Sequence, residues 1–240
     1  MAGVCSVILV AGLSDAVSLR RHGLLSGTPG RICMTPAIAK PPLVLASQSP
    51  RRQELLHLCG EPFTAMAADL DEDDLIREMN EARAGDPFIQ RVSYIVMSLA
   101  RAKAGKILAE HPEAVVIGAD TIVTIDGDIL GKPSSPEDAY NMLHRLSGRE
   151  HQVLTGVSLR SIEKEETFYT VTRVTFYPWD LREKEWAHRY IATGIPMDKA
   201  GAYGIQDMGA LLVSKIEGDF YTVMGLPVAE ISRRLIDFGY

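Results

Sequence analysis

The chain has 240 residues, of which 46% are hydrophobic and 23% charged, which is too apolar for a disordered chain and too charged for a membrane protein. Its 25 basic and 31 acidic residues give a net charge of −6, whereas proteins that live on duplex DNA or RNA usually carry a net basic field. Phosphate recognition must therefore be local, and we expect neither a nucleic acid polymer nor a membrane as partner.

The first forty residues differ from the rest. Residues 1–40 carry Arg20, Arg21, Arg31 and Lys40 against the single acid Asp15, a bias compatible with an organelle transit segment. The alternative is a loose extension upstream of a start at Met34. We expect residues 1–41 to be an N-terminal extension, targeting or disordered, and residues 42–240 to form one domain.

The cysteines and histidines carry little chemistry. Cys5, Cys33 and Cys59 form no Cys-X-X-Cys pair, and the six histidines show neither His-X-His nor His-Glu-X-X-His spacing. A disulfide scaffold or a structural zinc site is therefore not expected. We expect a reducing compartment, the cytoplasm, unless residues 1–40 direct the chain to an organelle.

The predicted elements begin with a buried strand at 43–46. A helix follows, with Ser49 as N-cap and Pro50 at its first position, and stops at Gly60. The clearest helix covers residues 86–109, because its apolar residues recur along one helical stripe. The residues of that stripe are Phe88, Val92, Ile95, Val96 and Leu99.

The second half alternates strands and helices. We expect a buried strand at 114–121, a hairpin at 122–130 that turns at Asp126-Gly127, and a helix between Ser135 and Gly148. The remaining predicted elements are strands at 152–160 and 167–176, a helix at 180–192, a glycine-rich loop, a strand at 210–216 and a helix at 227–238. This interleaving predicts an α/β (mixed α+β) fold with a mixed β-sheet flanked by helices.

A basic turn follows the first predicted strand, where the chain reads Ser47-Gln48-Ser49-Pro50-Arg51-Arg52. Backbone N–H groups at a helix N-terminus are unsatisfied and attract anions. Two arginines here oppose the helix dipole but match phosphate oxygens, so a bound polyphosphate would compensate for them. The alternative is a solvated basic turn beside a capping serine.

Asp120, followed by Thr121, comes at the end of the strongly apolar run 114–119. In open α/β sheets, ligands collect at the carboxyl ends of strands. A carboxylate there can coordinate a divalent ion or take a proton from water. We therefore expect Asp120 to be functional; the alternative is an aspartate that only caps the following turn.

Three further segments carry weaker signals. Gly131-Lys132-Pro133 could present a lysine to phosphate, but it is no Walker A loop, and this pattern alone favours an ordinary lysine at a hairpin exit. In the loop 198–206, small residues permit close approach of a ligand, and the Gln206 amide could pair with uracil or thymine; a tight connecting loop is the alternative. The acidic cluster at 69–74 offers oxygen ligands to Mg²⁺ or Mn²⁺, or begins a solvated helix.

Taken together, these segments resemble the Maf family of nucleotide pyrophosphatases over roughly residues 42–238. Each segment is weak alone, but their number and order are highly specific. The sequence around Asp120 and at 147–156 is also similar to the Maf-like domain that animals carry fused to a methyltransferase-like domain. The matching segments are Leu45 to Leu56, Leu99 to Ala104, Val116 to Val123, Gly131-Lys132-Pro133, Leu146 to His151, Asp198 to Gln206 and Gly225-Leu226-Pro227.

The resemblance implies a fold related to the inosine triphosphatase group and an enzyme that is often a homodimer. It implies hydrolysis of a nucleoside triphosphate, dTTP or UTP, between the α- and β-phosphates, with Mg²⁺ or Mn²⁺ as cofactor. The alternatives are a pyrophosphatase for 7-methyl-GTP or a broad set of modified nucleotides, or a nucleotide-binding regulator of cell division without turnover. Thr121 and Gln206 favour the dTTP/UTP type.

The resemblance also implies residue roles. Asp120 is the expected proton acceptor, and Asp120 and Glu72 the expected metal ligands. The expected determinants of base preference are Arg51, Thr121 and Gln206. Further expected catalytic or substrate-binding positions are Ser47, Ser49, Arg52, Lys103 and Lys132.

Overall fold

The computed structural model describes residues 40–240. The predicted transit segment or loose extension, the start at Met34, Cys5 and Cys33 therefore lie outside the described residues. Between residues 40 and 240, no helix combines the length and the apolar character needed to cross a bilayer.

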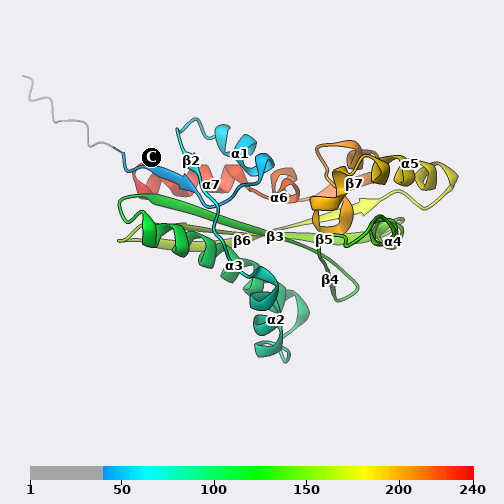
Figure 1. Ribbon diagram of the computed structural model, residues 1–240, viewed down its shortest axis with the longest axis horizontal. Coiled ribbons are helices and arrows are strands. Elements are labelled where there is room, and N and C mark those ends of the chain that lie inside the picture. The colour runs from blue at the N-terminus through cyan, green and yellow to red at the C-terminus, as the bar shows by residue number, and fades with distance from the viewer. Residues whose placement is uncertain (1–39) are drawn as a thin grey trace, which may run out of the picture. The chain divides into compact units, whose positions relative to one another are not determined.

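A seven-stranded mixed sheet organises the described chain, so the predicted mixed α/β fold is confirmed (Figure 1). Its order is β2-β1-β3-β5-β6-β7, with β4 paired to β3. Strand β1 runs parallel to both of its neighbours, β2 and β3, and every other pair of neighbouring strands is antiparallel. The strands are β1 (Leu43–Leu45), β2 (Thr64–Ala65), β3 (Val115–Ile125), β4 (Asp128–Leu130), β5 (Glu150–Arg160), β6 (Glu165–Phe176) and β7 (Val213–Glu217).

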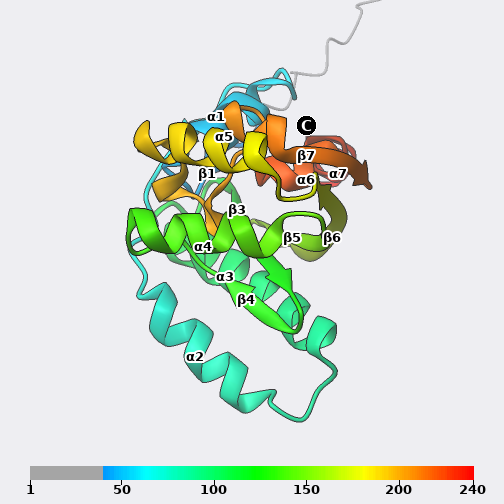
Figure 2. The same ribbon diagram turned by 90° about the vertical axis from the view of Figure 1, so that its right-hand side faces the viewer.

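Helices cover both faces of this sheet. The α-helices are α1 (Pro50–His57), α2 (Glu72–Ala82), α3 (Phe88–Glu110), α4 (Pro136–Leu146), α5 (Leu181–Ala192), α6 (Phe220–Met224) and α7 (Val228–Leu235). Helix α3 lies along one face and α1, α6 and α7 lie over the other (Figure 1). Helix α2 packs on α3 and extends away from the sheet (Figure 2). Short 3-10 turns occur at Ile195–Asp198, Ala200–Ala202, Met208–Leu212 and Ile236–Phe238.

Two glycines let α3 lie directly on the sheet. A Cβ at Gly118 of β3 would stand 2.1 Å from the Ala100 carbonyl oxygen, and one at Gly156 of β5 would stand 2.5 Å from that of Val96. Any side chain at either position would push the helix away from the strands. The close approach brings Lys103 of α3 over the face of β3 that carries Asp120.

One expectation about β3 is wrong. A strand at 114–121 and a separate hairpin strand after it were expected, whereas β3 runs without interruption from Val115 to Ile125. Asp120 therefore lies in the middle of a strand and not at its carboxyl end. The site is open there for another reason. Strand β1 pairs as far as Ile117 and β4 from Val123, so in the described part of the chain the stretch between them has a strand partner on one side only.

The chain beyond β6 also differs in detail. The expected strand at 210–216 begins at Val213, because the Asp207 side chain accepts a hydrogen bond from Gly209 N and starts a 3-10 turn before it. The short elements β2 and α6 were not expected at all. Helices α1, α3, α4, α5 and α7 lie where the sequence predicts them, within a few residues at their ends.

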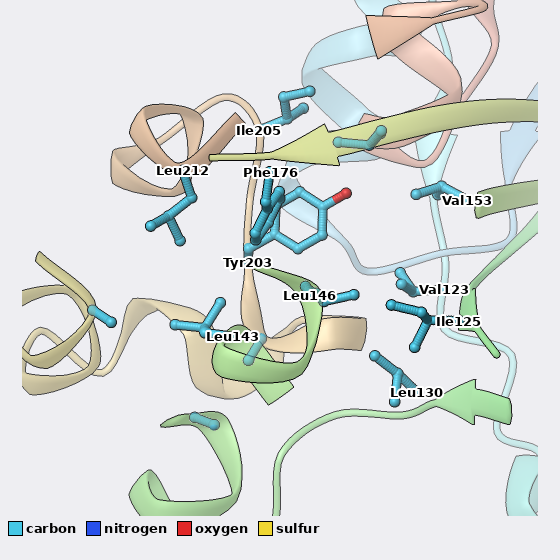
Figure 3. Close-up of a cluster of buried hydrophobic side chains, with 14 of the residues drawn as sticks. Val123, Ile125, Leu130, Leu143, Leu146, Val153, Phe176, Tyr203, Ile205 and Leu212 are labelled. Carbon is cyan, nitrogen blue, oxygen red and sulfur yellow. The ribbon is translucent and has the colours of Figure 1, made fainter. Parts of the chain in front are cut away.

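A large buried cluster fills the end of the sheet near α4 and α5 (Figure 3). Phe176 and Tyr203 meet there edge to face, with ring centroids 4.9 Å apart. Tyr203 and Ile205 come from the glycine-rich loop, and both point into the cluster (Figure 3). The apolar cluster therefore anchors the loop that carries Gln206.

Candidate functional site

A cleft of about 1210 Å³ lies where β1 ends beside β3. It is lined by the loop after β1, the start of α1, the approach to α2, the middle of β3, the exit of β4 and the glycine-rich loop. The structure brings every residue that the sequence suggested for the site to this cleft. Those residues are Ser47, Ser49, Arg51, Arg52, Glu72, Lys103, Asp120, Thr121, Lys132 and Gln206.

Asp120 and Thr121 are neighbours in β3 and therefore point to opposite faces of the sheet. Asp120 faces α3, where its Oδ1 accepts a hydrogen bond from Lys103 Nζ at 2.7 Å. The same ammonium lies 3.0 Å from Glu72 Oε2, at the start of α2. Lys103 therefore joins two carboxylates that are 48 positions apart in the sequence, and all three side chains face the cleft.

Arg52 occupies the other face of β3. Its Nε donates to Gly225 O at 2.9 Å, its Nη2 to Thr121 Oγ1 at 3.0 Å and its Nη1 to Ser47 Oγ at 3.5 Å. Burial lowers the pKa of this guanidinium, although the charges of Asp120 and Glu72 act in the opposite direction. Arg52 thus ties the start of α1 to β3 and to the end of α6.

Thr121 belongs to a chain of hydroxyl groups. Its Oγ1 lies 3.0 Å from Thr155 Oγ1, and the buried Thr155 hydroxyl donates to Thr222 O at 2.7 Å. With Arg52 as its other partner, the Thr121 hydroxyl is held from two sides. The structure therefore fixes the side chain that the resemblance links to base preference.

The first turn of α1 points into the cleft. Ser49 is its N-cap, but no side chain that the structure describes caps the first N–H groups of the helix, and its first turn has no acidic residue. The buried Ser47 hydroxyl accepts from Ser49 N at 3.2 Å. The helix start therefore offers unpaired donors and a positive dipole end to the cleft, next to Arg51.

Arg51 forms an ion pair across the cleft. Its Nη1 lies 3.0 Å from Asp198 Oδ2, at the beginning of the glycine-rich loop. The other oxygen of Asp198 accepts from Lys199 Nζ at 2.7 Å. Burial by itself would raise the pKa of Asp198, but the hydrogen bonds from Lys199 and Arg51 outweigh it and hold that pKa below its usual value.

Lys132 and Gln206 both line the cleft, and both are exposed. Neither side chain has a hydrogen bond or ion pair with another residue of the 40–240 range. Gly201 N, in the glycine-rich loop, donates to Gly131 O at 3.0 Å, so the two segments that carry Lys132 and Gln206 are joined through their backbones. Both side chains are therefore available to a ligand.

The cleft is charged at one end and mainly apolar at the other. Cationic and acidic side chains gather around the start of α1 and Asp120, whereas the apolar end lies where β4 and β5 pair with Val123 of β3, beside Tyr203. These apolar lining residues are Val123, Ile129, Leu130, Val153 and Tyr203. This division suits a molecule with one highly charged part and one flat, less polar part.

Asp198 and Lys199 are cleft residues that sequence reasoning did not assign to the site. Both stand inside the segment Asp198 to Gln206, so the resemblance offered a signal. The contact that gives Asp198 its place is with Arg51, 147 positions earlier in the chain. No local pattern reveals such a pair.

Within residues 40–240, no group of three or more His, Cys, Asp or Glu side chains is arranged to hold a metal ion by itself. Asp120 and Glu72 nevertheless form a two-carboxylate set, since one oxygen of each lies within 3.0 Å of Lys103 Nζ. Mg²⁺ is commonly held by one or two carboxylates together with substrate phosphates and water. The donor set therefore fits a divalent ion that binds together with a phosphate ligand.

Known proteins resemble this chain over the whole described domain. The family model described as Maf-like protein matches residues 42–238. The dTTP/UTP pyrophosphatase of Bacillus velezensis is 52% identical over 197 residues, which is 82% of this chain and 96% of that protein. The proteins of the same name from Bacillus pumilus and Symbiobacterium thermophilum are 50% and 45% identical, over 82% of this chain and 96% and 94% of their own lengths.

Proposed function

Because the chain belongs to the family of Maf-like proteins, we propose that it is a nucleoside triphosphate pyrophosphatase. It hydrolyses dTTP and UTP to the nucleoside monophosphate and pyrophosphate, and so removes selected triphosphates from the nucleotide pool. The observation that carries this proposal is the convergence of Arg51, Lys103, Lys132 and Asp120, from four separate segments, on one cleft.

The triphosphate binds at the charged end. Arg51, Lys103 and Lys132 supply cationic donors, and the first turn of α1 supplies backbone N–H groups beside Ser47 and Ser49. Arg51 exchanges Asp198 for a phosphate oxygen, which costs little because a partly exposed ion pair contributes at most about 1 kcal/mol. Arg52 adds charge to this end while it holds α1 against β3.

The base lies at the apolar end, against Val123, Leu130 and Tyr203. Uracil and thymine present a ring N–H between two carbonyl oxygens, and the free Gln206 amide can pair with groups of both kinds. Thr121, held by Arg52 and Thr155, lies on the same face of β3 as Val123 and assists in this selection.

Asp120 acts as the general base. As the oxygen of water forms a bond to the α-phosphorus, a water proton passes to the Asp120 carboxylate. The bond between the α-phosphorus and the oxygen that bridges to the β-phosphorus breaks, and its electron pair leaves with pyrophosphate. Lys103 orients the Asp120 carboxylate, and Lys132 and Arg51 stabilise the charge on the leaving group.

Asp120 and Glu72 are the side chains that would hold Mg²⁺ or Mn²⁺ alongside the phosphates. When bound, the ion neutralises phosphate charge and lowers the pKa of a water molecule. Lys103 contacts both carboxylates, so it keeps them close together before the substrate arrives.

A substrate panel tests the function. Purified protein with Mg²⁺ is incubated with dTTP, UTP, CTP, 7-methyl-GTP and ITP, and pyrophosphate and orthophosphate are measured separately. We expect pyrophosphate as the first product, with dTTP and UTP turned over fastest. Orthophosphate as the first product would mean cleavage at a different bond. A preference for 7-methyl-GTP or ITP would mean that the enzyme selects a different base. Tight binding without turnover would indicate a nucleotide-binding regulator of cell division.

A homodimer is part of the proposal. Among residues 40–240, the first half of β6, up to Thr172, pairs with β5 alone, and Tyr169 and Val171 on this stretch are 43% and 37% exposed. A strand edge without a partner can pair with another chain. Light scattering on the purified full chain should give twice the mass of one chain, and a mass of one chain would contradict the dimer.

We assign the enzyme to the cytoplasm, where it would meet the nucleotide pool. Imaging of the full-length chain with a C-terminal fluorescent tag tests this location. Accumulation in an organelle that is lost when residues 1–39 are removed would instead identify these residues as a targeting segment.

A further inference from the structure

The loop that carries Gln206 has a backbone conformation that needs support. Gly201 and Ala202 both have positive φ angles, of 70° and 60°, and alanine rarely adopts this left-handed conformation. Such backbone persists only where its surroundings hold it from several sides. Tyr203 and Ile205 anchor the loop in the apolar cluster, but Gln206 itself is exposed and has no partner between residues 40 and 240.

A single hydroxyl group holds the chain on both sides of Gln206. Tyr190, in α5, is fully buried, and its hydroxyl accepts a hydrogen bond from Gly204 N at 3.0 Å. The same hydroxyl donates to Asp207 Oδ1 at 2.8 Å. Gly204 lies two residues before Gln206, and Asp207 directly follows it. The Tyr190 hydroxyl therefore bridges the two ends of the four-residue segment that contains Gln206.

Asp207, which accepts the hydrogen bond from Tyr190, is itself held in place by other contacts. Asp207 Oδ1 also accepts from Gly209 N at 2.9 Å, and Asp207 Oδ2 lies 3.6 Å from the buried Lys199 ammonium. Lys199 Nζ in turn donates to Ile195 O at 2.5 Å. Burial raises the pKa of the Tyr190 hydroxyl, so that it keeps its proton and remains a donor to Asp207.

The residues bridged by Tyr190 are packed too closely for the loop to shift. A Cβ at Gly204 would lie 2.3 Å from Asp207 Oδ2 and 2.8 Å from Lys199 Cε, and a Cβ at Gly209 would lie 2.6 Å from Gly204 O. A loop packed this closely can move Gln206 only if the hydrogen bonds to Tyr190 break. The backbone from which the Gln206 side chain extends is therefore fixed relative to α5 and to the apolar end of the cleft.

We propose that Tyr190, with Asp207 as its acceptor, is a positioning residue for base selection, because its hydroxyl holds the backbone on both sides of Gln206. This inference rests on the proposed function, in which Gln206 recognises the pyrimidine ring. Uracil offers a donor between two acceptors, whereas cytosine replaces this donor with an acceptor. An amide held in place distinguishes the two, and an amide free to shift adapts to both.

The test compares Tyr190→Phe with wild type in the full chain. The substitution removes one oxygen and leaves the ring, so it creates no cavity. Dissociation constants for UTP and CTP, measured by calorimetry without turnover, should converge: the preference for UTP falls about tenfold, the effect of one well-placed hydrogen bond. In kinetic assays, KM for UTP rises by a similar factor while kcat stays within about twofold of wild type.

A matched control is Tyr240→Phe. It also removes a tyrosine hydroxyl, but this hydroxyl donates to the Pro41 carbonyl oxygen and not to the segment from Gly204 to Asp207. The UTP/CTP ratio of this variant should equal that of wild type. Asp207→Asn, which keeps an acceptor oxygen for Tyr190, should retain the preference, and Asp207→Ala should lose it as Tyr190→Phe does.

A double-mutant cycle separates positioning from general loosening of the fold. In a Gln206→Ala background, Tyr190→Phe should leave the UTP/CTP ratio unchanged, because the group that it positions is gone. An equal effect in both backgrounds, or an unchanged ratio in a well-folded Tyr190→Phe protein, would overturn the inference. Preferential binding of UTP without hydrolysis would refute the proposed activity and leave the positioning role standing; absence of any nucleotide binding would refute both.

Discussion

Lys103 and Asp120 form an ion pair at the floor of the cleft, with 2.7 Å between Nζ and Oδ1 and about nine-tenths of each side chain buried. The pair exists because Gly118 and Gly156 let α3 lie directly on β3 and β5. A helix held farther from the sheet would separate the ammonium from the carboxylate. The contact therefore links the packing of the domain to the geometry of its proposed active site.

Asp120→Asn should lower turnover at least about 100-fold, the low end of what a general base contributes. Asparagine keeps the shape and can still accept the hydrogen bond from Lys103, so binding of the triphosphate should remain within a few-fold. Pyrophosphate release gives turnover, and calorimetry gives binding. Near-normal turnover in a protein that melts at the wild-type temperature would remove Asp120 from this role.

Removal of divalent ions with a chelator should abolish hydrolysis, and added Mg²⁺ or Mn²⁺ should restore it. Glu72→Gln should raise the Mg²⁺ concentration for half-maximal activity at least about tenfold, because even partners one shell further from a metal change affinity by that factor. Glu78→Gln, on an exposed part of the same helix, is the matched control. An unchanged metal requirement in Glu72→Gln would exclude Glu72 as a ligand.

Gln206→Glu should impair dTTP and UTP selectively. A carboxylate can accept from the ring N–H but would repel the carbonyl oxygens of the base, which the amide can satisfy. We expect kcat/KM for UTP to fall at least about tenfold more than kcat/KM for CTP, whose amino group can donate to the carboxylate, because an unpaired polar group typically produces discrimination of this size. Equal loss for all bases in the substrate panel would show that Gln206 acts in another way.

His151 should make the domain less stable in mild acid. It is buried, with Nε2 2.8 Å from the Tyr203 hydroxyl, and burial lowers its pKa from 6.5 to about 3. Between these values the unfolded chain binds a proton that the folded chain does not, so stability falls as the pH drops below 6.5. From pH 7 to pH 5 the loss from this one group should be about 2 kcal/mol.

Urea unfolding of wild type and His151→Gln at pH 7 and pH 5 measures this contribution. Carboxylates add to the pH dependence of both proteins, so the difference between the two isolates the histidine. The variant should lose about 2 kcal/mol less than wild type over this range. The same pH dependence in both would mean that His151 is protonated in the folded protein.

Much of the site was predictable from local sequence. Ser49-Pro50 marks the start of α1, and the arginines that follow it lie at the cleft, as a helix N-terminus with basic residues suggests. The apolar stripe of α3 and the buried run of β3 were equally clear. Lys132 and Gln206 could not be separated from ordinary loop residues by their own segments, and only the order of all the segments together pointed to them.

Other features depend on contacts between distant parts of the chain. Asp120 lies in mid-strand because β3 pairs with β5 on both sides of it, and its site is open because β1 and β4 stop pairing before they reach it. The ion pair of Arg51 with Asp198 and the bridge from Tyr190 to Asp207 likewise need the finished fold.

The sequence alone thus determined most helices and most strands, the mixed sheet and the residue types of the site, because capping, periodicity and burial are local properties. Tertiary structure decided which side chains meet, since a contact between residues far apart in the chain forms only after the elements have packed. The close packing of α3 against Gly118 and Gly156 is the clearest case. Neither glycine stands out in the sequence, but together they determine where Lys103 meets Asp120.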